Sequence, residues 1–336
     1  MTPKVMIILG SASDIEIAKK SIKILEKLEI PYSLKVASAH RTHDKVKKLV
    51  VDATEAGVEV FIGIAGLAAH LPGAIAAYTY KPVIGVPVDA KLGGLDALYA
   101  CSQMPFPAPV ATVGIDRGDN GAILAGQIIA THDEEIKKNI SKIRLEYQDK
   151  VKNGEKEVLS KLDGNFIDKN FLKEEFFEEK EITAEKVEEA PLVSIIAGSY
   201  TDLDSAKKVT SVLDRMGISY DLAIISPIRY ADRFEEYMKK MEDVKLFIAV
   251  SGLSALVTGS IVALSEKPVI GVPCSSKGDV HDALLTMIQM PPGVPVGTVG
   301  SDNGRNAAIL AGEILGLTNE KIEDNLKWIK YKTAEL

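Results

Sequence analysis

Short apolar runs alternate with longer amphipathic segments along the first part of the chain. The pattern predicts strands at 5–9, 33–36, 60–63, 83–86 and 110–113, and helices at 15–28, 44–55, 73–79 and 95–103. Strands made of continuous apolar runs are covered on both faces, so this βαβα order predicts a parallel sheet between two layers of helices. Ligands of such sheets bind beyond the carboxyl ends of the strands, which makes the strand-to-helix turns the candidate site.

The same motifs occur twice in the same order. Ile-Leu-Gly-Ser-Ala-Ser-Asp at 8–14 returns as Ile-Ala-Gly-Ser-Tyr-Thr-Asp at 196–202. Lys-Pro-Val-Ile-Gly-Val-Pro at 81–87 returns unchanged at 267–273, and shorter matches follow along both parts. Matches in one order over a domain length indicate a duplicated domain rather than a short solenoid repeat.

The duplication predicts a domain at 1–132, a connector at 133–190 and a second domain at 191–336. Each domain is expected to be a doubly wound, three-layer α/β unit. The connector is dense in Lys and Glu. Its first part, 134–151, carries apolar residues at helical spacing and is expected to form a helix packed on the first domain. A second short helix is expected around 171–179.

Composition narrows the function classes. A length of 336 residues fits two domains, and 46% hydrophobic with 26% charged residues is typical of globular proteins. A net charge of −7 offers no basic field for nucleic acid or an anionic membrane, so any phosphate recognition must be local. Two cysteines and a start without an apolar signal region favour the reducing cytoplasm. No apolar run approaches the roughly 20 residues of a spanning helix.

The first turn, Gly-Ser-Ala-Ser-Asp at 10–14, follows a strand and opens a helix. Free backbone N–H groups at a helix start favour a phosphate, and the hydroxyls of Ser11 and Ser13 can add hydrogen bonds. Asp14 can accept hydrogen bonds from a ribose. Ser and Asp are also preferred helix caps, so a purely structural role stays open.

The second turn, Ser-Ala-His-Arg-Thr at 38–42, follows the next strand. Arg41 is suited to clamp a phosphate with two N–H groups. His40 beside it is the side-chain type that exchanges protons near neutral pH. In the structural alternative, Arg41 pairs with a surface carboxylate and His40 fills space.

The third turn, Gly-Leu-Ala-Ala-His-Leu-Pro-Gly at 66–73, is rich in small residues that let backbone approach a ligand closely. A lone histidine in such a run, here His70, is more often a core residue. The three turns are expected to leave one sheet edge from adjacent strands. This convergence favours a shared site that moves a proton beside a bound anion.

The second copy serves as an internal control. It keeps the polar residues of the first two turns as Ser199, Asp202, Ser226 and Arg229. Both histidines are lost, because Ile228 stands at the position of His40 and Leu256 at that of His70. Histidines needed only for packing have no reason to disappear together while the surrounding motifs persist. The first copy is therefore predicted to be catalytic and the second to keep only the fold and, at most, a phosphate site.

The motifs at 10–14, 38–42 and 65–73 closely resemble the N5-carboxyaminoimidazole ribonucleotide mutase family of purine biosynthesis. The resemblance spans nearly all of residues 4–132. It implies flavodoxin-like domains and an isomerase that moves a carboxyl group from the exocyclic nitrogen of the ribonucleotide to ring carbon C4. The family works without metal or organic cofactor, and its subunits form octamers with sites at subunit junctions.

By this resemblance, Ser11 and Asp14 bind the ribonucleotide and Arg41 holds its phosphate. His40 is the general acid and base, and His70 stands in the wall of a closed pocket that retains the CO2 released midway. The full set comprises catalytic His40 and His70, and substrate-binding Ser11, Ser13, Asp14, Ser38, Arg41, Gly66 and Leu71.

The sequence departs from the family at His43, where many relatives have proline, and in its fusion to a copy without histidines. Four tandem chains could supply the eight domains of the family's assembly. Two other functions stay open. One is direct carboxylation of aminoimidazole ribonucleotide by CO2, and the other is a non-catalytic nucleotide sensor or flavin-binding module, which the fold alone permits.

Overall fold

The computed structural model describes residues 2–160, 191–275 and 280–334. The first copy contains β1 (Val5–Leu9), α1 (Ile15–Lys27), β2 (Tyr32–Val36), α2 (His43–Glu55), β3 (Val60–Gly66), α3 (Leu71–Ala76), β4 (Val83–Val88), α4 (Leu95–Ser102), β5 (Ala111–Thr112) and α5 (Gly118–Ile129). The long helix α6 (Glu134–Ser160) follows.

The second copy repeats this order and ends with one more helix. Its elements are β6 (Val193–Ala197), α7 (Leu203–Met216), β7 (Tyr220–Ile224), α8 (Ala231–Lys240), β8 (Leu246–Ser251), α9 (Leu256–Leu264), β9 (Val269–Pro273), α10 (Val280–Ile288), β10 (Gly297–Thr298), α11 (Gly304–Leu315) and α12 (Glu320–Ala334).

Each copy has the strand order of a doubly wound domain. The order is β2-β1-β3-β4-β5 in the first copy and β7-β6-β8-β9-β10 in the second, with parallel pairing within each copy. This is the flavodoxin-like arrangement, and it confirms the predicted fold class.

The apolar strands are buried on both faces because helices cover both. Val5, Ile7 and Leu9 share a buried cluster with residues of α1 and α5, whereas Met6 and Ile8 belong to a cluster with residues of α2, α3 and α4. Successive side chains of a strand point to opposite faces, which explains the alternation between the two clusters.

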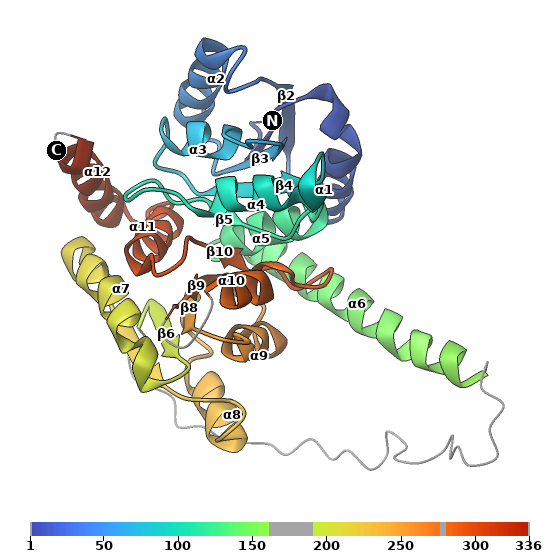
Figure 1. Cartoon of the computed structure of the whole chain (residues 1–336), viewed down its shortest axis with the longest axis vertical. Coiled ribbons are helices and arrows are strands. Elements are labelled where there is room, and N and C mark those ends of the chain that lie inside the picture. The colour runs from blue at the N-terminus through green and yellow to red at the C-terminus, as the bar shows by residue number, and fades with distance from the viewer. Residues whose placement is uncertain (1, 161–190, 276–279, 335–336) are drawn as a thin grey trace.

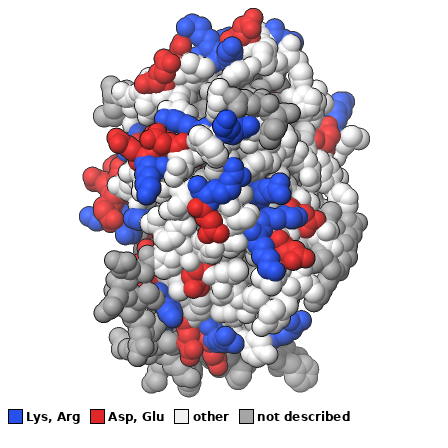
Figure 2. All heavy atoms as spheres, turned by 90° about the vertical axis from the view of Figure 1, so that its left-hand side faces the viewer, with Lys and Arg blue, Asp and Glu red and all other residues white. Residues whose placement is uncertain are grey.

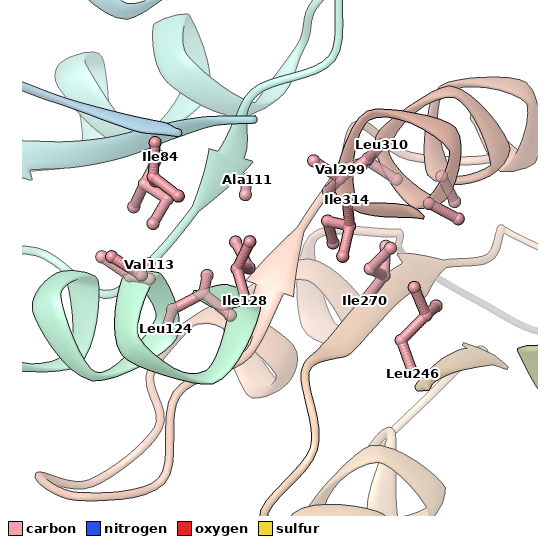
Figure 3. Close-up of a cluster of buried hydrophobic side chains, with 14 of the residues drawn as sticks. Ile84, Ala111, Val113, Leu124, Ile128, Leu246, Ile270, Val299, Leu310 and Ile314 are labelled. Atoms are coloured by element: carbon pink, nitrogen blue, oxygen red, sulfur yellow. The ribbon is translucent and has the colours of Figure 1, made fainter. Parts of the chain in front are cut away.

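The two copies join into one ten-stranded sheet, which the sequence did not predict (Figure 1). The link is an antiparallel pair between the short strands β5 and β10, where Thr112 lies opposite Thr298. Figure 3 shows side chains of both copies, among them Leu124 and Leu310, in one buried cluster. The halves are therefore joined by a shared core as well as by the chain.

Two equivalent asparagines fasten this junction from opposite sides. The side-chain amide of Asn120 donates to the carbonyls of Met290 and Pro291, at 3.2 and 3.0 Å. The amide of Asn306 donates to the carbonyl of Met104 at 2.9 Å. Both asparagines are buried, so these bonds satisfy backbone groups that water cannot reach.

The helix that follows each copy crosses to the other copy. In α6, the Arg144 guanidinium donates to the carbonyls of Val262 and Ala263 at 2.6 and 2.7 Å. In α12, the Lys330 ammonium donates to the carbonyl of Thr79 at 3.1 Å. Each helix also packs on its own copy: Ile136, Ile140 and Ile143 of α6 share the buried cluster of α1 and α5, as predicted for the segment 134–151.

Several predicted boundaries differ from the structure. The helix expected at 73–79 is α3, which begins at Leu71, and α6 extends past 151 to Ser160. The helix expected around 171–179 lies outside the described residues. Among the described helices, none has the length and apolar character needed to cross a bilayer. Figure 2 shows acidic and basic side chains interspersed on one face, without a field of one sign.

Candidate active site

The first turn is held by a reciprocal helix cap. Ser13 N–H donates to the Ser11 hydroxyl at 3.3 Å, and Ser11 N–H donates to the Asp14 carboxylate at 3.1 Å. The Ser13 hydroxyl adds a bond to the same carboxylate at 3.0 Å. Asp14 is 7% exposed, and this burial raises its pKa although the hydrogen bonds from Ser13 and Ser11 oppose the shift. The capping role left open by the sequence is thus present, and ligand binding by these residues stays a prediction.

The second turn is locked by contacts between its first and last residues. The Ser38 N–H donates to the Thr42 hydroxyl, and the Thr42 N–H donates to the Ser38 carbonyl, both at 2.9 Å. Arg41 N–H donates to the Ser38 hydroxyl at 3.2 Å. The Arg41 side chain is exposed and makes no hydrogen bond or ion pair with another described residue. A fixed backbone with an uncommitted guanidinium suits capture of an anion.

The third turn holds strained backbone. Leu67 and Ala69 have φ values of 56° and 38°, in the left-handed region that side chains with a Cβ atom disfavour. Gly66 lies in a tight place, because an added Cβ would lie 3.0 Å from the Cβ of Ala90 and 3.1 Å from the carbonyl oxygen of Val88. This conformation carries His70 to the start of α3, where its side chain is exposed rather than part of the core.

The two histidines meet directly. Nε2 of His40 lies 2.8 Å from Nδ1 of His70, and their ring centroids are 4.9 Å apart at an interplanar angle of 60°. One of the two nitrogens must carry the hydrogen and the other must accept it. The pair therefore keeps one proton between two imidazoles, and a second proton at this contact would break the bond. Because both side chains are exposed, a ligand can reach the pair.

The three turns open at one edge, because β2, β1 and β3 are neighbours in the sheet (Figure 1). This places the turns that carry Ser11, Arg41 and Gly66 side by side, as the sequence analysis expected. Leu71 differs from the other predicted residues because its side chain is 2% exposed and packs in the buried cluster with α2 and α3. Only its backbone is available to a ligand.

Two features of the site were not foreseen. One is the direct hydrogen bond between His40 and His70. The sequence contains a sign of this pairing, because the second copy lacks both histidines together. The other is the contact made by His43, at which the sequence indicates only a departure from the family. Its Nε2 lies 2.8 Å from the Tyr78 hydroxyl, and α2 begins at this residue without a proline.

The AIR carboxylase family model matches twice, over residues 4–150 and 192–335. The chain belongs to the AIR carboxylase family. The double match confirms the tandem duplication, and it agrees with the resemblance drawn from the motifs of the first copy.

Relatives of this AIR carboxylase family member include proteins of the same tandem length. A probable N5-carboxyaminoimidazole ribonucleotide mutase of Methanothermobacter thermautotrophicus is 59% identical over 335 residues and covers 100% of both chains. The N5-carboxyaminoimidazole ribonucleotide mutase of Methanocaldococcus jannaschii is 54% identical over 148 residues, which are 44% of this chain and 90% of that protein. A crystal structure of Treponema denticola PurE covers 46% of this chain and 98% of its own, with 27% identity and a TM-score of 0.41.

The second AIR carboxylase domain keeps the backbone of the site without its imidazoles. Leu253 and Ala255 adopt φ values of 54° and 47°, as the third turn of the first domain does. A pocket of about 110 Å³ lies among the three equivalent turns and is lined by Ile228 and Leu256 where the first domain has histidines. The two domains therefore share the turn geometry, and of the two only the first carries the histidine pair.

Proposed function

We propose that the first half converts N5-carboxyaminoimidazole ribonucleotide to 4-carboxyaminoimidazole ribonucleotide. The observation that carries the proposal is the hydrogen-bonded pair of His40 and His70, at the sheet edge where Arg41 offers an uncommitted guanidinium. The names of the relatives support the same reaction.

The reaction needs one proton to be given and one to be taken. When the carboxyl group leaves the exocyclic nitrogen as CO2, the C–N bond breaks and His40 donates a proton to that nitrogen. C4 of the ring then attacks the CO2, and His40 removes the proton that C4 carries. His40 alone can serve as acid and then as base, because it regains in the second step the proton that it gave in the first. Nδ1 of His70 keeps the His40 ring oriented between the two steps.

The remaining predicted residues fix the substrate. Arg41 binds the phosphate with its guanidinium fork, and the turn at 10–14 faces the sugar through the hydroxyls of Ser11 and Ser13. Gly66 lets the third turn approach the ring without a clash. Water must be excluded while CO2 is free. The exposed Leu67 side chain beside this turn offers an apolar surface that a neighbouring subunit can cover.

We further propose that the chain acts in the cytoplasm as a homo-oligomer of four tandem chains. Each chain supplies one active half and one half that completes the assembly. Size-exclusion chromatography with light scattering measures this state, and a mass of one or two chains would contradict it.

Substitution of His40 tests the reaction. His40→Asn keeps a hydrogen-bonding side chain but cannot hold the proton, so turnover of the N-carboxylated substrate is expected to fall about 100-fold or more. His43→Asn is the matched control, because His43 contacts Tyr78 instead of His70. Unchanged turnover in His40→Asn would refute the role of His40.

Direct carboxylation is the second candidate, favoured by the description of the matching family as AIR carboxylase. The substrate separates the two reactions. The enzyme is given either the N-carboxylated ribonucleotide or aminoimidazole ribonucleotide with bicarbonate, and the mutase is expected to work efficiently only on the first. Efficient turnover of the second at low bicarbonate would replace the mutase with the carboxylase.

A further inference from the structure

The pocket of the second half retains groups that bind phosphate. It is lined by the three turns that follow β6, β7 and β8, and its polar side chains include Ser199, Asp202, Ser226 and Arg229. The Arg229 side chain is exposed and makes no hydrogen bond or ion pair with another described residue. A guanidinium without a carboxylate partner, in one pocket with the Ser226 hydroxyl, is a suitable receptor for a phosphate monoester.

The buried carboxylate in this pocket has a different role. Asp202 is 4% exposed and accepts a hydrogen bond from the Ser199 hydroxyl at 3.0 Å. The Ser199 hydroxyl also lies 2.6 Å from that of Thr201. A carboxylate repels a phosphate but accepts hydrogen bonds from a sugar hydroxyl. The pocket therefore offers a site for a ribose next to the phosphate site.

The turns around the pocket carry larger apolar and aromatic side chains than the turns of the first half. Four equivalent positions carry large exposed side chains in the second half, where the first half has Ala12, His40, Thr42 and His70. They are Tyr200, Ile228, Tyr230 and Leu256, with exposed fractions of 81%, 71%, 58% and 45%. A fold that needed these positions only for packing would not leave them open to water.

The two tyrosines directly follow residues that line the pocket. Tyr200 comes after Ser199, and Tyr230 comes after Arg229. An exposed ring next to a phosphate site is the arrangement on which a nucleobase stacks. The pocket of about 110 Å³ is smaller than the roughly 300 to 1,000 Å³ of sites that enclose a whole ligand, so a base would lie at the rim.

We propose that the second half binds a nucleoside 5′-monophosphate without transforming it. Arg229 and the Ser226 hydroxyl hold the phosphate, Asp202 accepts a ribose hydroxyl, and the base stacks on Tyr200 or Tyr230. No chemistry follows because Ile228 and Leu256 cannot transfer protons. This site goes beyond the reaction proposed for the first half, and its test does not require turnover.

The experiment is calorimetric titration of the full chain with adenosine 5′-monophosphate and with ribose 5-phosphate. An Arg41→Ala background weakens binding at the first half, so that the second half is observed. One molecule of adenosine 5′-monophosphate is expected to bind per chain, more tightly than ribose 5-phosphate. Arg229→Ala is expected to lower the affinity for both ligands by at least 10-fold. Arg233→Ala, an exposed arginine on α8 outside the pocket lining, is the matched control and is expected to weaken neither.

The first half shows which substitutions can measure the contribution of base stacking to affinity. Tyr200→Ala and Tyr230→Thr install the residues of the first half, which the same backbone already tolerates. Stacking of a base on an aromatic ring contributes roughly 1 to 3 kcal/mol. At least one of the two substitutions is therefore expected to lower the affinity for adenosine 5′-monophosphate by about 5-fold to 150-fold and to leave the affinity for ribose 5-phosphate unchanged.

Three results would overturn the proposal. One is the absence of binding in the Arg41→Ala background. Another is equal affinity for the two ligands that neither tyrosine substitution changes. The third is a change of oligomeric mass in the tyrosine variants without nucleotide binding, which would identify the rim as a contact between copies of the chain.

Discussion

The pH dependence of stability is expected to change when Glu313 is replaced by glutamine. Glu313 lies on α11, is 2% exposed, and places Oε1 2.6 Å from the ammonium of Lys330. Its other carboxylate oxygen has no hydrogen-bond partner among the described residues. The equivalent residue of the first half is Gln127, so Glu313→Gln copies a side chain that this fold already accepts.

Burial determines the size of the effect. It raises the pKa of Glu313 from 4.5 to about 7, although Lys330 opposes the shift. As the pH rises, the carboxyl group therefore ionises first in the unfolded chain, and the wild-type protein loses stability between pH 4.5 and about 7. At about 1.4 kcal/mol per pKa unit, the whole change is about 3 kcal/mol, of which most falls between pH 5 and 8.

Urea unfolding of both proteins at pH 5, 6, 7 and 8 measures this difference. The unfolding free energy of Glu313→Gln minus that of the wild type is expected to increase by about 2 to 3 kcal/mol across the series. Glu320→Gln, at an exposed position of α12, is the control for loss of one negative charge. A flat difference, or one that decreases with pH, would refute the assignment of the pH dependence to Glu313.

The other predictions concern the site and the junction. His70→Asn is expected to lower turnover about 100-fold while binding of the product persists, because the amide cannot share a proton with His40; equal loss of binding in calorimetry would contradict this. Asn120→Ala removes three hydrogen bonds of 2.9 to 3.2 Å across the junction and is expected to destabilise the chain by about 3 kcal/mol in urea unfolding. Gly66→Ala puts a Cβ atom 3.0 Å from a neighbouring one and is expected to reduce activity, whereas Gly259→Ala meets nothing within 4 Å and is its control.

The layers of the fold could be predicted from the sequence because apolar runs and amphipathic segments repeat regularly. The join between the halves could not. A strand was predicted at 110–113, but the paired strands, Ala111–Thr112 and Gly297–Thr298, have only two residues each, which is too short to indicate a partner. Their pairing depends on tertiary contacts such as that of Asn120 with Met290, which lie far apart in the chain.

The candidate site was predictable as far as topology determines it. Turns that follow adjacent parallel strands must meet at one edge, so the order of the strands brings the turns of His40 and His70 together. Their direct contact needed the left-handed backbone at Leu67 and Ala69, which a sequence without glycine at these positions does not indicate. The capping bonds of Asp14 likewise depend on a local geometry that the residue types only permit.

The asymmetry of the two halves extends to the crossing helices. Lys81 lies 3.4 Å from Glu323 where α12 meets the first half. At the equivalent junction Lys267 has Lys137 in place of that glutamate. Burial lowers the pKa of Lys267 to about 8, and the nearby lysines add to this shift although Asp243 and Glu242 oppose it. A free-standing dimer of identical domains must use the same residues at both junctions, whereas a fused chain can vary each one separately. The second half has thus changed the residues at its own junction while its α12 still contacts the first half.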